Sequence, residues 1–383
     1  MAARPARSIL RTAVVSLALV GGTLVVTPAP ASALLPCGTL LTPPCSVAPD
    51  TVITGMTPTP NSANWVNRRT VEVTFDHSYP EGQGPPATDG DGNPTGPTTY
   101  ECRLQAPEPQ DWAPCTSPKA YTGLPDTDRG QPSAVHTIGV RAVHPDGTKD
   151  ATPDSVSFRL DATEPDTHLL GAPTLVGPRQ NLLLDNTATF QYAVLNHSDE
   201  TNGDPVFRCT FDGRALPCPD TRKKTNGART ITGIKAGDHR FTVAGVDQAG
   251  NASRPPEAFA FHTPYNRVGT RRQINRMWTR VAAPGHYLDD YVVTRKKGSV
   301  LSRKFRNFNE VYLIVAKGPR HGRIRVDIGN TRVRTAKLSA KKFQRKRIVK
   351  VNIPGGRRTT GRIKVTVISP SGRTVMIDAI AVR

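Results

Sequence analysis

The stretch Arg240-Phe241-Thr242-Val243-Ala244-Gly245-Val246 decides the fold of the front of this chain. Apolar and polar residues alternate at its start, which is the pattern of a strand with one buried face. Asp247-Gln248-Ala249-Gly250-Asn251 follows and supplies a turn in which Gly250 can take a positive φ. Residues 257–262 then resume the strand pattern. The stretch therefore predicts part of an antiparallel β-sandwich.

The same unit occurs twice. Residues 136–158 align without a gap on residues 239–261, and six of these 23 positions are identical. The first copy opens with Pro49-Asp50-Thr51 and the second with Pro165-Asp166-Thr167. Each copy holds roughly 100 residues, the size of an immunoglobulin-like sandwich. The repeat predicts two tandem sandwiches of one design.

The second copy resembles the bacterial Ig-like repeats of secreted and cell-surface proteins. The resemblance covers about 49–263 and is carried by Cys209-Thr210-Phe211-Asp212-Gly213, Leu216-Pro217-Cys218, Gly237 to Val243 and Val246 to Asn251. The first copy departs from this pattern, with Arg103-Leu104-Gln105 where the second has Thr210-Phe211-Asp212. The resemblance implies an extracellular spacer or adhesion module, and it carries no catalytic residue with it.

The last third of the chain has different content. Strict alternation of apolar and polar residues predicts strands at Arg323–Ile328, Val349–Ile353 and Arg362–Val367. Glu310–Ala316 and Thr374–Val382 are more apolar, and we expect them to be central strands. Together they predict a third β-sandwich of the jelly-roll type.

This third unit resembles the C-terminal jelly-roll domains of bacterial secreted proteins, which are related in shape to carbohydrate-binding modules. The resemblance rests on Trp278, Phe305, the Gly318-Pro319 turn, Gly322, Gly361 and Met376-Ile377-Asp378-Ala379. The chain departs from the pattern at Asp327-Ile328-Gly329, and Arg362 replaces the usual histidine. The resemblance implies a scaffold for binding sugars.

Charge is divided unevenly along the chain. The formal net charge is +20, yet residues 267–383 have 30 Lys+Arg against 5 Asp+Glu, whereas residues 34–266 have 18 against 26. A basic domain beside an acidic front indicates an anionic partner. Ten cations on or before the alternating strands are the candidate polyanion-binding residues: Arg323, Arg325, Lys341, Lys342, Arg345, Lys346, Arg347, Lys350, Arg362 and Lys364.

The expected partner is an anionic cell-wall polymer or glycan, with another surface protein as a second candidate. The alternative is a solvated basic surface that has no partner. In that case the repulsion among its own positive charges would destabilise the domain. Nucleic acid is not expected as a dedicated ligand, because no nucleic-acid-binding motif occurs in the sequence.

The N-terminal residues indicate export. Arg4, Arg7 and Arg11 precede an apolar run over 12–26, and Ala31-Ser32-Ala33 provides the small residues of a cleavage site. The run is short for a membrane span of about 20 residues, so we expect cleavage after Ala33 and no transmembrane anchor; the alternative is an uncleaved anchor. The expected location is extracellular, in association with the cell wall.

The six cysteines agree with export. They form three close pairs along the chain, which predict local disulfides rather than metal ligands because the spacings do not match a zinc site. The predicted pairs are Cys37–Cys45, Cys102–Cys115 and Cys209–Cys218.

The sequence contains no catalytic motif. It lacks Gly-x-Ser-x-Gly, His-Glu-x-x-His, a phosphate loop and a dinucleotide fingerprint, so we expect neither enzymatic activity, nor a metal, nor a cofactor. Two alternative functions are an adhesin acting through the Ig-like modules and an extracellular polysaccharide-active hydrolase.

The loop Asp89-Gly90-Asp91-Gly92-Asn93 resembles the start of a calcium loop, but Pro94 stands where glycine is needed.

The expected organisation is all-β. The predicted parts are a signal peptide (1–33), a linker with Cys37 and Cys45 (34–48), two Ig-like domains (49–163 and 164–263), a linker (264–274) and a basic β-sandwich (275–383).

Overall fold

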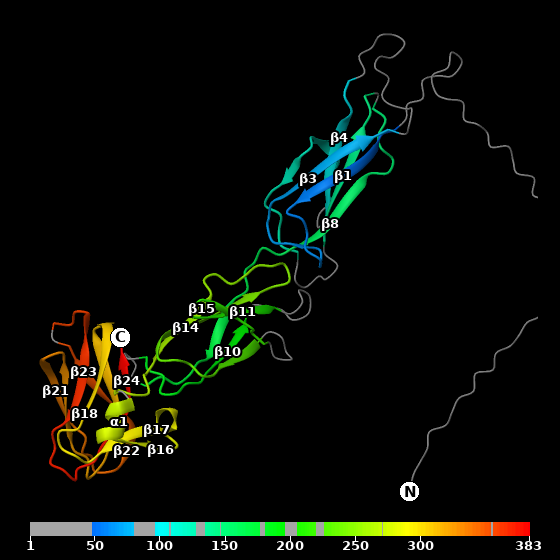
Figure 1. The fold of residues 1–383 in the computed structure, drawn as a ribbon. Coiled ribbons are helices and arrows are strands. Elements are labelled where there is room, and N and C mark those ends of the chain that lie inside the picture. The colour runs from blue at the N-terminus through cyan, green and yellow to red at the C-terminus, as the bar shows by residue number, and fades with distance from the viewer. Residues whose placement is uncertain are drawn as a thin grey trace, which may run out of the picture. The chain divides into compact units, whose positions relative to one another are not determined.

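A computed structural model describes most of the chain after residue 47. The described residues are 48–79, 96–106, 109–127, 135–145, 147–176, 181–195, 205–219, 226–269, 271–353 and 355–383. The predictions about the signal peptide, the Cys37–Cys45 pair and the Asp89–Asn93 loop lie outside these residues. Within them the protein is all-β, with two Ig-like β-sandwiches followed by a jelly-roll-like β-sandwich (Figure 1). None of the helices described there has the length and apolar content to cross a membrane.

The first Ig-like domain packs two sheets face to face. Their strand orders are β1-β3-β6 and β2-β8-β7-β4-β5. The strands are β1 (Asp50–Thr57), β2 (Trp65–Val66), β3 (Val71–Ser78), β4 (Thr99–Ala106), β5 (Ala113–Cys115), β6 (Lys119–Tyr121), β7 (His136–Val143) and β8 (Asp154–Leu160). Alternate residues of β3 and β7, among them Val71, Val73, Ile138 and Val140, fill the space between the sheets.

The second Ig-like domain repeats this arrangement. Its sheets have the orders β13-β10-β9 and β12-β11-β14-β15. The strands are β9 (Thr167–Gly171), β10 (Ala188–Val194), β11 (Val206–Phe211), β12 (Arg214–Leu216), β13 (Asn226–Ile231), β14 (Gly237–Val246) and β15 (Glu257–Thr263). The parallel contact of β2 with β8 has its counterpart in a parallel bridge between Leu182 and His262.

The strand register supports the sequence alignment of the two copies. His136 lies opposite Phe158 in the first domain, and His239 lies opposite Phe261 in the second. The two predicted disulfides of the described chain are present: Cys102–Cys115 joins β4 to β5, and Cys209–Cys218 joins β11 to the residues after β12. Each disulfide therefore closes the same hairpin of its copy.

The C-terminal domain is a sandwich of a five-stranded and a four-stranded sheet, ordered β16-β17-β24-β19-β22 and β18-β23-β20-β21. Its elements are α1 (Arg271–Met277), β16 (Thr279–Ala282), the 3₁₀ turn η1 (Tyr287–Asp289), β17 (Asp290–Thr294), β18 (Val300–Phe308), β19 (Glu310–Lys317), β20 (Arg323–Ile328), β21 (Thr331–Lys337), β22 (Gln344–Asn352), β23 (Thr359–Val367) and β24 (Val375–Val382). β19 and β24 have a neighbour on each side, as their apolar content predicted.

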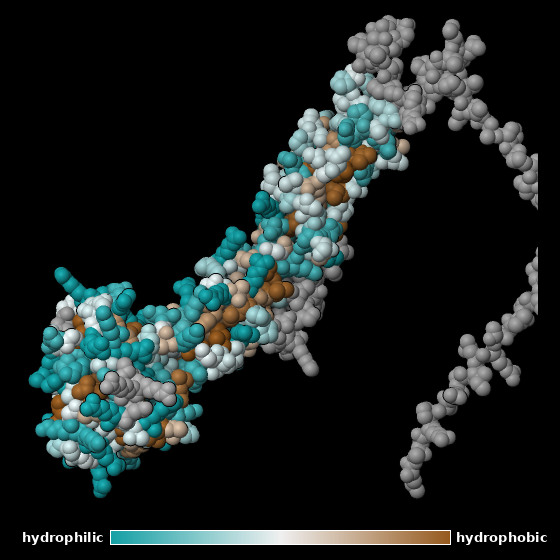
Figure 2. Space-filling model, viewed as in Figure 1, coloured by the Kyte–Doolittle hydropathy of each residue, from teal (hydrophilic) through white to brown (hydrophobic). Residues whose placement is uncertain are grey.

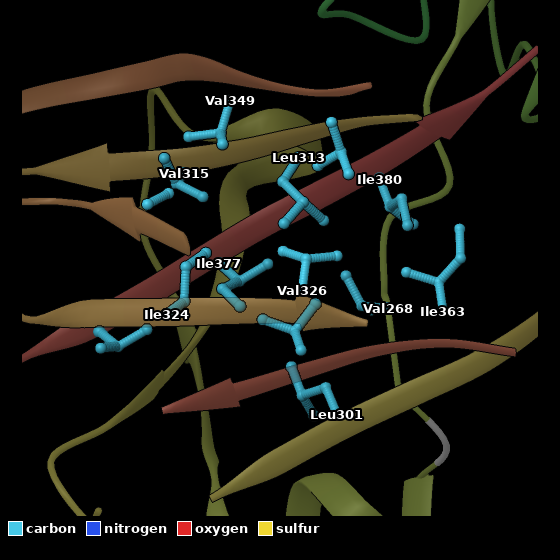
Figure 3. Packing of buried hydrophobic residues seen from close by; sticks show 14 of the residues in the cluster. Val268, Leu301, Leu313, Val315, Ile324, Val326, Val349, Ile363, Ile377 and Ile380 are labelled. Carbon is cyan, nitrogen blue, oxygen red and sulfur yellow. The ribbon is translucent and has the colours of Figure 1, made fainter. Parts of the chain in front are cut away.

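The core of this domain lies between the two sheets. Leu313 and Ile377 from one sheet meet Ile324, Val326 and Ile363 from the other (Figure 3). All five side chains are at most 1% exposed. The strict alternation in the sequence therefore assigns one face of each strand to this core.

The C-terminal domain includes residues that the sequence assigned to a linker. Val268 and Ile274 belong to its buried core, and α1 had not been predicted. The helix has seven residues, which is too short to show a helical period within a run of charged residues. The two apolar side chains alone could not reveal which sheet they would cover.

Candidate functional site

The outer surface of the four-stranded sheet is basic. Ile324, Val326, Ile363 and Val365 point into the core, so their neighbours along β20 and β23 project from the opposite face of the sheet. In the part of the sheet before the register shift between Val326 and Asp327, the strand register adds Lys304 from β18 and Lys337 from β21 to this face. We call this surface the basic face; it consists of Lys304, Arg323, Arg325, Lys337, Arg362 and Lys364.

The basic face places like charges directly opposite each other. Lys304 pairs with Arg362 across β18 and β23, and Arg323 pairs with Lys337 across β20 and β21. Opposed cations at such positions destabilise a sheet. Asp327 is the one carboxylate on these four strands, and it accepts a hydrogen bond from Arg325 Nε at 3.1 Å. The face therefore has a large excess of positive charge.

The structure separates the ten predicted cations into two groups. Arg323, Arg325, Arg362 and Lys364 lie together on the basic face, whereas the other six belong to β22 or to the residues just before it, at the edge of the other sheet. Alternation on a single strand predicts which side chains share a face of that strand. It does not reveal which strands become neighbours, and the structure places the ten cations on two surfaces.

Two cations of the β22 group already have partners. Lys350 lies 3.6 Å from Glu310 and sits over the ring of Tyr312. Lys346 Nζ donates a hydrogen bond to the carbonyl oxygen of Leu184 at 3.0 Å. These contacts give both side chains a structural role. Lys341, Lys342, Arg345 and Arg347 are exposed. Figure 2 shows hydrophilic residues over much of the C-terminal domain surface in that view.

Among the described residues of this domain, a buried histidine–aspartate pair resembles an arrangement used in catalysis. His286 Nδ1 lies 3.0 Å from Asp378 Oδ2, and the backbone N–H of Tyr287 donates to the other carboxyl oxygen. Burial lowers the pKa of His286, with Arg345 and Lys346 adding to the effect, while burial raises the pKa of Asp378 to about 7. Both shifts favour a neutral, hydrogen-bonded pair.

This pair is enclosed by the fold. The side chains of His286 and Asp378 are only 2% and 1% exposed. A substrate in solution therefore has no access to them, and their hydrogen bonds fix η1 against β24. The adjacent Asp289 and Asp290 differ in environment because they belong to different elements: Asp289 lies in η1 with a positive φ and is exposed, whereas Asp290 opens β17, is buried and is paired with Arg280.

A groove on the five-stranded sheet was not predicted from the sequence. It has a volume of about 500 Å³ and lies where α1, β16, β17 and the start of β24 meet. Arg276, Arg295 and Lys296 line it together with Trp278 and Tyr291. The basic turn Arg295-Lys296-Lys297-Gly298 after an apolar strand was the available signal. Among the described residues, no group of acidic, histidine or cysteine side chains is placed to hold a metal ion.

Comparisons with known proteins give no family assignment. No protein-family model matches the chain, and no curated protein matches it. Solved structures with some similarity include fibronectin(III)-like modules of Clostridium thermocellum CbhA, at 12% identity over 56% of this chain and 93% of that chain, with a TM-score of 0.33.

Two further structures are similar over different shares of the chain. The CBM36-1 domain of a xylanase from the hindgut metagenome of Trinervitermes trinervoides is 13% identical over 28% of this chain and 86% of its own, with a TM-score of 0.23. A Ca²⁺-stabilised adhesin of an Antarctic bacterium is 12% identical over 88% and 73%, with a TM-score of 0.27. Similarities with scores this low carry no argument about what this chain binds.

Proposed function

We propose that this chain is an exported, non-catalytic protein of the cell envelope, in which the Ig-like domains act as spacers and the C-terminal domain binds an anionic wall polymer or glycan. The binding surface is the basic face. The two disulfides and the signal-like N-terminal sequence support an oxidising, extracellular location.

One observation carries the proposal. The Lys304–Arg362 and Arg323–Lys337 pairs place cations opposite each other on an exposed sheet face. Such pairs make the free protein less stable, and a polyanion laid across the strands removes that repulsion. A polymer with regularly spaced negative charges can bridge neighbouring strands, and the binding weakens as salt rises.

The non-catalytic part of the proposal rests on accessibility. The His286–Asp378 pair is enclosed by the fold, and the basic face carries a single carboxylate, Asp327, which Arg325 engages. A hydrolase acting on glycans uses two carboxyl groups that flank the scissile bond. Turnover by the full chain in a screen of glycosidase and esterase substrates would contradict this part.

The binding part is tested by charge removal on one face. The change is the quadruple variant Lys304→Gln/Arg323→Gln/Lys337→Gln/Arg362→Gln in the full chain. We expect affinity for heparin and for isolated cell walls to fall at least about tenfold at low salt, since each lost contact removes a charge-assisted interaction. The slope of log affinity against log salt should become shallower by up to about four. Chromatography and sedimentation across a salt series measure both.

A matched control separates the face from net charge. The variant Lys341→Gln/Lys342→Gln/Arg345→Gln/Arg347→Gln loses the same four charges at and before β22. It should retain most of the binding. Equal losses in the two variants would show that total charge alone attracts the polymer.

The quadruple variant of the basic face should also unfold at a temperature equal to or above that of the parent protein, because removing each opposed pair relieves a few tenths of a kcal/mol of repulsion.

A further inference from the structure

The groove on the five-stranded sheet has an apolar floor. Thr279, Val293 and Met376 lie side by side in one row across β16, β17 and β24. Their neighbours Val292 and Val375 are buried, so the row projects from the outer face of the sheet. Val293 and Met376 are each partly exposed there, which leaves an apolar strip open to solvent at the bottom of the groove.

An aromatic wall stands beside this floor. Tyr291 lies on β17, projects to the same side as Val293 and is partly exposed. Trp278 lines the groove from the residue after α1 and is 4% exposed. Its indole N–H has no hydrogen-bond partner among the described residues, and an unpaired buried donor of this kind is unfavourable.

The rim of the groove is positive. Arg276, Arg295 and Lys296 are exposed on it, and no Asp or Glu lines the groove. None of the ion pairs formed between described residues involves these three side chains; Arg295 Nε donates to the hydroxyl of Thr374 at 3.3 Å. The groove therefore offers three cations on its rim, together with the hydroxyls of Thr374 and of Thr279 at the end of the floor row.

We infer that this groove binds a single acidic sugar residue, a pyranose that carries a carboxylate. The carbon–hydrogen face of the ring would lie on Val293, Met376 and Tyr291, and the carboxylate would face Arg276 and Arg295. The groove volume of about 500 Å³ lies within the usual range of small-ligand sites and accommodates one such residue. A bare phosphate would leave the apolar floor uncovered, and a neutral sugar would leave the cations without a counter-charge. This site lies on the opposite sheet from the basic face and does not depend on it.

The test uses the full chain and defined oligosaccharides. Trp278 is the only tryptophan after residue 112, so its fluorescence reports on this groove. Digalacturonate should change that fluorescence saturably, while digalactose and inorganic phosphate should bind at least about tenfold more weakly. The signal should be absent in the Trp278→Phe variant. Binding of digalacturonate should weaken less steeply with salt than binding of the polymer, because it involves fewer charge contacts than an extended polymer interface.

Two variants identify the site. Arg276→Gln/Arg295→Gln should weaken digalacturonate binding by about tenfold or more, because it removes the cations that face the carboxylate. Both arginines are exposed, so the core should not be disturbed. Lys304→Gln/Arg362→Gln, which removes two charges from the basic face, should leave it within about twofold. Equal affinity for digalacturonate and digalactose, equal affinity for phosphate, or undiminished binding by the first variant would each overturn the inference. None of these outcomes bears on polymer binding by the basic face.

Discussion

The two Ig-like domains share a strand order and a register, yet they fill their interiors differently. In the second domain Phe241 stacks on Phe190 with ring centroids 4.1 Å apart, and Phe259 and Phe261 lie around them. At the position of Phe241 the first domain has Ile138, in a mainly aliphatic core. The two domains therefore share a backbone arrangement, but the second has an aromatic core where the first has an aliphatic one.

A buried hydrogen-bonded node shows the same contrast. In the first domain the hydroxyl of Thr51 accepts a hydrogen bond from the N–H of Ala142, and Asp150 accepts one from the N–H of Thr51. In the second domain the hydroxyl of Thr167 accepts from the N–H of Gly245.

The partner of that threonine is where the two nodes diverge. Ser253 stands in the position of Asp150, and its hydroxyl is hydrogen-bonded to that of Thr167. In both copies a backbone N–H donates to the threonine hydroxyl. The residue that bonds this threonine is ionisable in the first copy (Asp150) and neutral in the second (Ser253). The two copies have thus kept the arrangement of their strands but not the residues inside it, as we expect for the proposed spacer role, which depends on shape rather than on particular side chains.

The largest effect should come from breaking the aromatic core. Phe241→Ala in the second domain should lower the free energy of unfolding by about 3–5 kcal/mol, because a large buried ring is removed and a cavity remains. Ile138→Ala at the equivalent position of the first domain should cost less, about 2–4 kcal/mol, since no ring stacking is lost. Hydrogen exchange of peptides from β14 and β7 measures each domain separately. A larger loss for Ile138→Ala would contradict the contrast between the cores.

Removing the disulfides should affect both copies almost equally. The bridged residues are 13 positions apart in the first domain and 9 in the second. In the chain-entropy model each bridge contributes about 3 kcal/mol, with a difference of only about 0.3 kcal/mol. Cys102→Ser/Cys115→Ser and Cys209→Ser/Cys218→Ser should therefore lower the two unfolding transitions alike in calorimetry. A loss confined to one copy would show that the shared hairpin is not equally important in both.

A smaller effect should come from the node, and it should depend on pH. Burial acts to raise the pKa of Asp150, but hydrogen bonds from Thr51 and Thr152 outweigh it and hold the pKa below its ordinary value. The resulting stability is present above the unfolded pKa of about 3.9 and is lost as the pH falls through the lower folded pKa. Asp150→Ser should cost the first domain about 2 kcal/mol at pH 7 and much less near pH 2.

The reciprocal change provides the control for the node. Ser253→Asp in the second domain places a carboxyl group beside Thr167, and Asp150→Ser gives the first domain the neutral partner of its copy. Thermal unfolding from pH 2 to pH 7 should show a reduced acid sensitivity of the first domain in the Asp150→Ser variant. Unchanged acid sensitivity would mean that other carboxylates govern it.

The sequence predicted most of the fold because its signals are local. Alternation in Arg323–Ile328 and Arg362–Val367 determines which side chains enter the core, and the repeat fixes the register of His136 and His239. Cysteines that are close in the chain can meet across one hairpin, which made the Cys102–Cys115 pair predictable.

The candidate sites were only partly predictable because they depend on which strands become neighbours. Lys350 shares its alternating pattern with Arg325, but its strand joins the other sheet. The groove unites Arg276, Tyr291 and Met376 from three separate segments. No local pattern relates such residues, since their proximity follows from long-range strand pairing. Val268 and Ile274 were assigned to a linker for the same reason.

Among the described residues, both disulfides lie in the Ig-like domains, and the sequence has no cysteine after Cys218. A reducing agent would therefore act on the two parts unequally. It would loosen the Ig-like domains and make them more susceptible to proteases, but it would break no disulfide in the C-terminal domain, which is proposed to bind the polymer. Under reducing conditions the Ig-like domains would therefore lose stability before the C-terminal domain did.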